Sequence, residues 1–212
     1  MKNSNSDIKA VANMRGYINI DWLEKNDIDG FIHLSKNTSK KEVDAFISEM
    51  FNYVNIDAGT DINMGIPNAV EHTKKKDAAT LGMMIGGLLF YDGDKKIFPG
   101  CCCGLESFNE IISAIENKQG AWLGHDPSAY FEYTDTELIV WSVSSEELNE
   151  YNGIFEKYSV HFKYSELREL LVKAKNDFYE FLTIALNDRF IELGLLDTKP
   201  IILSLLKSFK LT

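Results

Sequence analysis

The sequence has no apolar run long enough to span a membrane. Its longest apolar stretch, residues 81–91, is short and interrupted by three glycines, whereas a spanning helix needs about 20 apolar residues. The N-terminal segment MKNSNSDIKAVANMRG also lacks the apolar core of a signal peptide. We therefore expect a cytoplasmic protein that does not insert into a membrane.

Cysteine is scarce, and all three cysteines are adjacent, at Cys101, Cys102 and Cys103. Disulfide-stabilised secreted proteins distribute their cysteines along the chain, and three neighbours cannot cross-link distant parts of a fold. The sequence thus predicts a fold held together by its apolar core, in a reducing compartment.

Positive charge is in deficit, with 22 Lys and Arg against 32 Asp and Glu, a formal net charge of −10. Nucleic-acid binding depends on basic groups that displace counterions from phosphates, so we expect no nucleic-acid partner. An acidic surface suits a basic protein partner, because complementary charge speeds encounter. Acidity also serves solubility alone, so charge by itself does not decide the function.

The length of 212 residues and the 45% apolar content fit one domain, residues 1–212, with residues 1–16 expected to be poorly ordered or weakly helical. Capping boxes begin at Ser39 and Ser107, where a Ser and a Glu three residues later satisfy free backbone donors. Apolar residues at helical spacing predict helices over residues 40–54, 107–119 and 165–193, and one that begins at Pro200. Gly194 is expected to end the long helix.

Alternating apolar and polar residues predict strands over 17–20 and 31–34, which pair with each other. Two hairpins are expected, one joining 88–91 to 96–98 through an Asp-Gly turn and one joining 129–133 to 137–142. The periodicity of residues 78–86 fits a helix or a strand equally. The predicted class is α+β, with a mainly antiparallel sheet packed against the long C-terminal helix and other helices.

The most unusual segment runs from Pro99 to Pro127. The sequence PGCCCGLE lies between a predicted strand and a predicted helix N-terminus, where free N–H groups can bind an anion or lower the pKa of a thiol. About 20 residues later, WLGHDP supplies a histidine and a carboxylate. The helix over 107–119 either returns this loop to the cysteines or leaves it at the far end.

Three interpretations of the cysteines stay open. A thiol enzyme would use Cys101, Cys102 or Cys103 as the thiolate, His125 as its base and Asp126 as the orienting group, although adjacent residues orient each other's side chains poorly. A metal site would combine Cys101 and Cys103 with His125 and either Asp126 or His72. Zinc sites typically use paired Cys-x2–4-Cys motifs, so neither a metal nor another cofactor is favoured. The third interpretation is structural, with small thiols filling a buried corner.

A binding role for the same segment would use glycine backbone, an aromatic ring and charged side chains. The candidate binding residues are Gly100, Gly104, Glu106, Trp122, His125 and Asp126. Trp122 can anchor either the core or an interface, and we expect the core.

The stretches PGCCCGLESF and GAWLGHDPSAYFEY resemble a signature of uncharacterised bacterial proteins, which are similar to the small acidic immunity partners of polymorphic toxins. The resemblance covers about 40 residues and carries no catalytic residue to this chain. It implies a protein-binding module that inhibits a toxin domain. A thiol- or metal-dependent enzyme is the alternative function.

Overall fold

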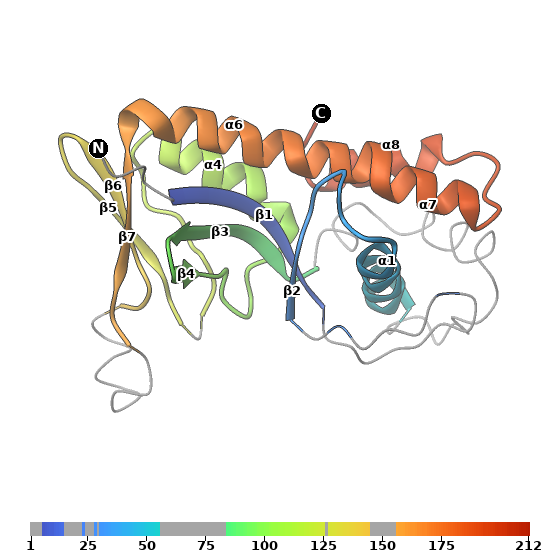
Figure 1. The fold of residues 1–212 in the computed structure, drawn as a ribbon, viewed down its shortest axis with the longest axis horizontal. Coiled ribbons are helices and arrows are strands. Elements are labelled where there is room, and N and C mark those ends of the chain that lie inside the picture. The colour runs from blue at the N-terminus through green and yellow to red at the C-terminus, as the bar shows by residue number, and fades with distance from the viewer. Residues whose placement is uncertain are drawn as a thin grey trace. The chain divides into compact units, whose positions relative to one another are not determined.

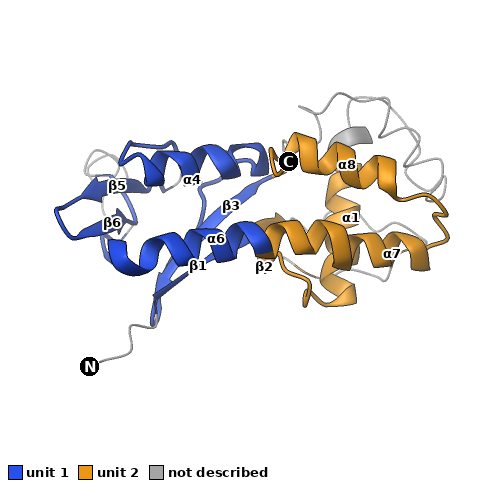
Figure 2. Ribbon diagram, turned by 90° about the horizontal axis from the view of Figure 1, so that it is seen from above, with its two compact units in different colours: residues 1–10, 85–176 blue, residues 11–84, 177–212 orange. Residues whose placement is uncertain are grey.

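The chain divides into two compact units. The structure, a computed structural model, describes residues 6–14, 23, 28, 30–55, 84–125, 127–144 and 156–212 (Figure 1). Unit 1 comprises residues 1–10 and 85–176, and unit 2 comprises residues 11–84 and 177–212 (Figure 2). Strand β1 and helix α6 each begin in unit 1 and continue into unit 2.

The strands of unit 1 form antiparallel hairpins. Strands β3 and β4 pair around the turn at Gly93, and β5, β6 and β7 form a three-stranded sheet in that order. The bounds are Gly86–Asp92 for β3, Lys95–Ile97 for β4, Tyr130–Tyr133 for β5, Glu137–Trp141 for β6 and Ser159–Lys163 for β7. Both predicted hairpins are confirmed, whereas β7 was not predicted, although Val160 and Phe162 alternate inward with exposed neighbours.

Helix α4, Phe108–Glu116, packs on β3. The apolar residues whose helical spacing predicted it are all buried: Phe108, Ile111, Ile112 and Ile115. The prediction of a capping box at Ser107 is wrong, because the side chain of Ser107 makes no cap hydrogen bond. A 3-10 turn, η2 (Leu105–Ser107), comes first, so Ser107 already has helical backbone angles of φ −84° and ψ −6°, whereas a capping residue is extended.

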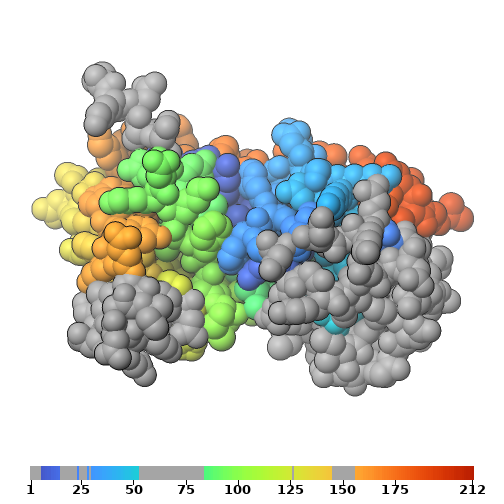
Figure 3. All heavy atoms as spheres, turned by 60° about the horizontal axis from the view of Figure 1, so that its bottom comes forward, coloured from blue at the N-terminus to red at the C-terminus, as the bar shows by residue number. Residues whose placement is uncertain are grey.

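Aromatic rings join the two sheets of unit 1. The Phe90 ring of β3 lies 5.7 Å from that of Phe131 and 6.0 Å from that of Phe162, both at steep interplanar angles. Edge-on pairs of this kind are favoured by the ring quadrupole. On the face shown in Figure 3, the green atoms of the β3–β4 hairpin lie beside the orange atoms of β7.

Strand β1 (Ser6–Met14) corrects one expectation for the N-terminus. Residues 1–16 were expected to be poorly ordered or weakly helical, but Ile8, Ala10, Ala12 and Met14 alternate inward along a strand. Alanine contributes little apolar signal, so the period was missed. In unit 2 the end of β1 pairs antiparallel with β2 (Gly30–His33). Strand β2 thus has β1 as its described partner, and the expected strand at 17–20 lies outside the described residues.

The helices of unit 2 follow the predicted pattern. Their bounds are Lys40–Asn55 for α1, Phe181–Leu186 for the π-helical η3, Asn187–Glu192 for α7 and Lys199–Ser208 for α8. The first capping box is confirmed: the Ser39 N–H donates to Glu42 Oε2 at 2.9 Å, and the Glu42 N–H donates to Ser39 Oγ at 3.3 Å. Helix α6 (Tyr164–Glu180) continues through η3 into α7, and Gly194 follows at φ +89°.

Among its described residues, the core of unit 2 contains aromatic rings and a buried ion pair. The Phe46 and Phe181 rings meet edge to face at 4.8 Å. The guanidinium of Arg189 donates to both carboxylate oxygens of Asp44 at 2.6 and 2.8 Å, and the Asp44 side chain is fully buried. Bidentate geometry of this kind gives strong, oriented hydrogen bonds, so α1 and α7 are locked together within the unit.

The structure thus confirms the α+β class, with antiparallel strands and a long C-terminal helix. Of the ambiguous segment 78–86, Ile85 forms a β-bridge with Gly104 and Gly86 begins β3, so its described end is extended. Residues 78–83 lie outside the described residues. Within the part of the chain that is described, none of the helices has the length and apolarity required to cross a membrane.

Candidate functional site

The cysteine turn, residues 100–103, is a hydrogen-bonded turn between β4 and η2. The Cys103 N–H donates to the Gly100 carbonyl at 3.1 Å, which places Cys101 and Cys102 at the tip. The Gly86 N–H donates to the Cys103 carbonyl at 2.9 Å. The turn is therefore fixed at its C-terminal end to the start of β3.

The tryptophan loop, residues 120–125, lies against this turn. The Gly100 N–H donates to the Leu123 carbonyl at 2.7 Å, and the Cys101 N–H donates to the His125 carbonyl at 2.9 Å. The question left open by the sequence is thereby answered, because the chain returns after α4 and brings the two motifs side by side. The contact is made by backbone atoms. It gives hydrogen-bond partners to N–H and C=O groups that would otherwise be buried without them.

Two glycines allow the backbones to approach so closely. A Cβ atom on Gly124 would lie 2.7 Å from the Cα of Gly100, and one on Gly100 would lie 2.7 Å from the carbonyl carbon of Gly124. Gly124 also has φ +96°, a conformation that L-residues with side chains rarely adopt. Gly100 was a predicted site residue, whereas Gly124 was missed, although its place inside the WLGHDP motif was a usable signal.

The three thiols have different environments. Cys101 and Cys102 are exposed, and their Sγ atoms are 3.2 Å apart. Cys103 is fully buried, and burial, together with the nearby Glu106 carboxylate, raises the pKa of its thiol to about 12. The expectation of a buried corner therefore holds for Cys103 and is wrong for its two neighbours. Because the thiolate is the reactive species, Cys103 is unsuited to nucleophilic attack near neutral pH.

Gly104 and Glu106 sit on the inner side of the turn. Gly104 is buried, and a Cβ atom there would overlap the carboxylate of Glu106. Glu106 is itself half-buried. These two predicted binding residues therefore support the turn from within and present little surface to a partner.

Trp122 and His125 face solvent. The Trp122 side chain is 52% exposed and its ring lies edge-on to that of His125, with centroids 5.3 Å apart. The expectation that Trp122 anchors the core is therefore wrong. Helical periodicity says nothing about a residue in a loop, and the burial of Leu123 beside it shows that the loop turns alternate side chains in and out. The predicted partner Asp126 lies outside the described residues.

A pocket of about 260 Å³ adjoins Trp122. It lies between α4 and the tryptophan loop and is lined by Ser107, Glu110, Ile111, Ala114, Gly120, Ala121 and Trp122. Its walls are mainly apolar, and Glu110 adds a carboxylate. Such a pocket suits a side chain with an apolar stem and a cationic end.

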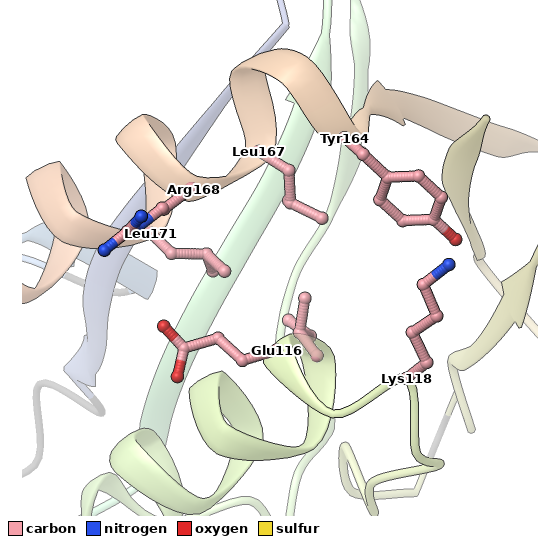
Figure 4. A pocket seen from close by; sticks show the side chains of 7 residues that line it. Glu116, Lys118, Tyr164, Leu167, Arg168 and Leu171 are labelled. Carbon is pink, nitrogen blue, oxygen red and sulfur yellow. The ribbon is translucent and has the colours of Figure 1, made fainter.

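A second pocket, of about 340 Å³, lies between α4 and α6 in unit 1. Figure 4 shows Glu116 and Arg168 at one end and Lys118 beside Tyr164 at the other, with the apolar side chain of Leu167 pointing from α6 into the space between them. The Lys118 Nζ is 4.1 Å from the centroid of the Tyr164 ring, a cation–π contact. The sequence reasoning did not find this pocket, because its residues come from two helices far apart in the chain.

Metal ligands do not gather among the described residues, where no three His, Cys, Asp or Glu side chains are placed to hold an ion. Cys101 and Cys102 share the turn with the backbone of His125, while Cys103 is turned inward. The fourth ligands considered for a metal site, Asp126 and His72, lie outside the described residues.

Comparisons of the chain with protein-family models, with curated proteins and with solved structures give no match.

Proposed function

We propose that this chain is a protein-binding module that docks a basic protein through Trp122, His125 and the pocket beside Trp122. The single observation that carries the proposal is the exposure of Trp122, at 52%, on a loop whose backbone is fixed. Tryptophan is enriched among the residues that dominate protein interfaces. A ring held in place before binding also loses little entropy when a partner covers it.

The charge of the chain selects the class of partner. The net charge of −10 favours encounter with a basic protein, and Glu110 lines the pocket that adjoins Trp122. A Lys or Arg side chain of the partner would bury its stem against Ile111 and Ala114 and place its charge near Glu110. The partner class is a basic toxin domain, with this chain as its immunity-type inhibitor in a bacterial cytoplasm and with no part played by nucleic acid.

The test compares Trp122→Ala with Val172→Ala. Val172 is a matched control because it is also in unit 1, apolar and 49% exposed. A partner is captured from the native host with the unaltered chain, identified and purified, and its Kd is measured by titration against all three proteins. We expect a basic partner whose Kd rises about 30-fold with Trp122→Ala, equivalent to about 2 kcal/mol, and stays unchanged with Val172→Ala.

Salt dependence supplies a second criterion. The association rate should fall as salt rises, because exposed charges are screened beyond about 10 Å at 0.1 M ionic strength. Equal affinity of the unaltered chain and the Trp122→Ala variant, or an association rate that is independent of salt, would refute the proposal.

The exposure of Cys101 and Cys102 favours one second candidate, an enzyme with one of these thiols as nucleophile and His125 as base. Catalysis requires a thiolate near neutral pH. Iodoacetamide should then label one of the two much faster than it labels a small free thiol, and the His125→Ala variant should lose that advantage. Equal rates for the protein and the small thiol would exclude this candidate.

A further inference from the structure

The side chains of Cys101 and Cys102 form a vicinal thiol pair at the tip of the cysteine turn. Their Sγ atoms are 3.2 Å apart and both residues are exposed. The hydrogen bond from the Cys103 N–H to the Gly100 carbonyl holds the turn in the form that brings these sulfurs together. An oxidant in solution can therefore reach both atoms without any opening of the fold.

Adjacent cysteines form a particular kind of disulfide. Neighbouring Cα atoms across a trans peptide are about 3.8 Å apart, whereas ordinary disulfides join Cα atoms about 4.4–6.8 Å apart. A bond between neighbours therefore strains the backbone, and strained, exposed disulfides are the readily reduced ones. Such a bond serves as a reversible modification and adds no cross-link to the fold.

The third cysteine is excluded from the pair by its position. Cys103 is fully buried, and its Sγ would lie 3.4 Å from a Cβ atom on Gly87 of β3. A bond from Cys103 to either neighbour would require its side chain to leave the core. The geometry therefore specifies which two of the three sulfurs react.

We propose that Cys101 and Cys102 are a reversible oxidation site. Low-molecular-weight disulfides such as oxidised glutathione are the oxidant, and the product is a vicinal disulfide between the two cysteines. One thiolate attacks a glutathione sulfur, a protein–glutathione bond forms and the first reduced glutathione leaves. The neighbouring thiolate then attacks the protein sulfur of that mixed disulfide, and the second reduced glutathione leaves. Two electrons pass from the protein to the glutathione disulfide, and the two thiol protons end on the released glutathiones.

The bond has a structural consequence for the tryptophan loop. The Cys101 N–H donates to the His125 carbonyl, and the Gly100 N–H donates to the Leu123 carbonyl. Closing a ring through the Cys101–Cys102 peptide constrains ψ of Cys101 and φ of Cys102, the torsions next to these hydrogen bonds. We therefore expect oxidation to shift the contact between the cysteine turn and the tryptophan loop.

The experiment equilibrates the purified full chain with glutathione buffers of increasing oxidised-to-reduced ratio, quenches with acid and alkylates under denaturing conditions. Tryptic cleavage yields one peptide, residues 97–118, which holds all three cysteines. As the oxidised-to-reduced ratio rises, we expect one transition, in which the peptide loses the mass of two hydrogen atoms before alkylation. In the oxidised form, Cys103 alone should carry the alkyl group. Excess reduced glutathione should restore three alkylated cysteines.

Variants and spectra complete the test. Cys101→Ser and Cys102→Ser should each retain one glutathione, because the resolving thiol is gone. In NMR spectra, the backbone amide chemical shifts of Gly100, Cys101 and Trp122 should change on oxidation of the unaltered chain, while that of Phe131 in β5 should not. The proposal is overturned by any of four results: a stable glutathione adduct on the unaltered chain, a disulfide that includes Cys103, a disulfide between two copies, or no oxidation at any ratio. Unshifted amide signals on oxidation would overturn the link to the loop.

Discussion

The two units of this chain hold segments together by different kinds of contact, one between backbone atoms and the other between charged side chains. In unit 1 the cysteine turn and the tryptophan loop meet through backbone atoms, at Gly100 and Gly124, where no side chain fits. In unit 2 the helices α1 and α7 are joined by the side chains of Asp44 and Arg189, buried and bidentate. The glycine contact holds surface residues close to solvent, whereas the ion pair lies inside and holds only the core.

The difference predicts how each region responds to substitution. A buried ion pair is vulnerable to the loss of one partner, because the remaining charge has no compensation. A glycine contact is vulnerable to the gain of a single methyl group. Loss of one ion-pair partner lowers the stability of unit 2. A methyl group at the glycine contact lowers the stability of unit 1 and also displaces the exposed tryptophan loop.

The largest effect is expected in unit 2. Asp44→Ala should lower the free energy of unfolding by about 3 kcal/mol, because the buried Arg189 keeps its charge and is left with the exposed carboxylate of Glu192, 3.0 Å away, as its ion-pair partner. The double variant Asp44→Leu with Arg189→Met should recover most of this loss, since apolar residues of similar size often replace a buried pair without cost. Urea denaturation of the three proteins measures both values, and a double variant as unstable as the single one would contradict the interpretation.

Gly124→Ala tests the glycine contact. The new Cβ meets Gly100 backbone and the residue has φ +96°, so we expect a loss of about 2–4 kcal/mol and altered fluorescence of Trp122. Gly93→Ala is the matched control, because Gly93 has φ +61° but open space around its Cβ position, and should cost about 1 kcal/mol. Equal losses in the two variants would show that close approach contributes nothing.

Within the cysteine turn, burial should separate the thiols. Cys103→Ser should lower stability by about 1–3 kcal/mol, because a hydroxyl is costlier than a thiol to bury, whereas Cys102→Ser at the exposed tip should be nearly neutral. Native-state iodoacetamide labelling gives a second readout. With the Cys103 pKa raised to about 12, its thiol should stay unlabelled near neutral pH while the other two react.

The smallest effects distinguish the two capping boxes. Ser39→Ala should cost about 1 kcal/mol, because the Ser39 and Glu42 side chains accept from each other's N–H groups. Ser107→Ala should cost far less, since the Ser107 side chain makes no cap hydrogen bond. Thermal unfolding of both variants measures the difference, and a larger loss at Ser107 would contradict the observed start of α4.

Local patterns were reliable wherever neighbours in sequence decide the structure. The apolar spacing in α4 and along residues 165–193 predicted helices and their buried faces, since side chains three and four residues apart share one face. Gly194 and the Asp-Gly turn at residues 92–93 were recognised from backbone requirements that belong to the residue type itself. Strand β1 was missed because its inward residues include two alanines, whose apolar signal is weak.

The candidate site was only half predictable. The segment from Pro99 to Pro127 was identified from its composition alone, and the backbone of His125 does lie against the turn that carries Cys101 and Cys102. The burial of Cys103 and the exposure of Trp122 were not predictable. The first depends on how the cysteine turn packs against Gly87 of β3, and the second on how the tryptophan loop is held against that turn. The WLGHDP motif marks Gly124 as a candidate site residue, but no local pattern indicated that its contact would be with Gly100.

The amino-acid sequence by itself determined the α+β class, most helices, both hairpins, the acidic balance and the location of the unusual segment. Each of these depends on residues within a few positions of one another, or on composition. Tertiary structure alone decided which sulfur is buried, which ring reaches solvent, and that α4 returns the tryptophan loop to the cysteine turn. Those outcomes depend on contacts between residues more than 15 positions apart, such as Cys103 with Gly86 and Cys101 with His125, and form only when the whole unit packs.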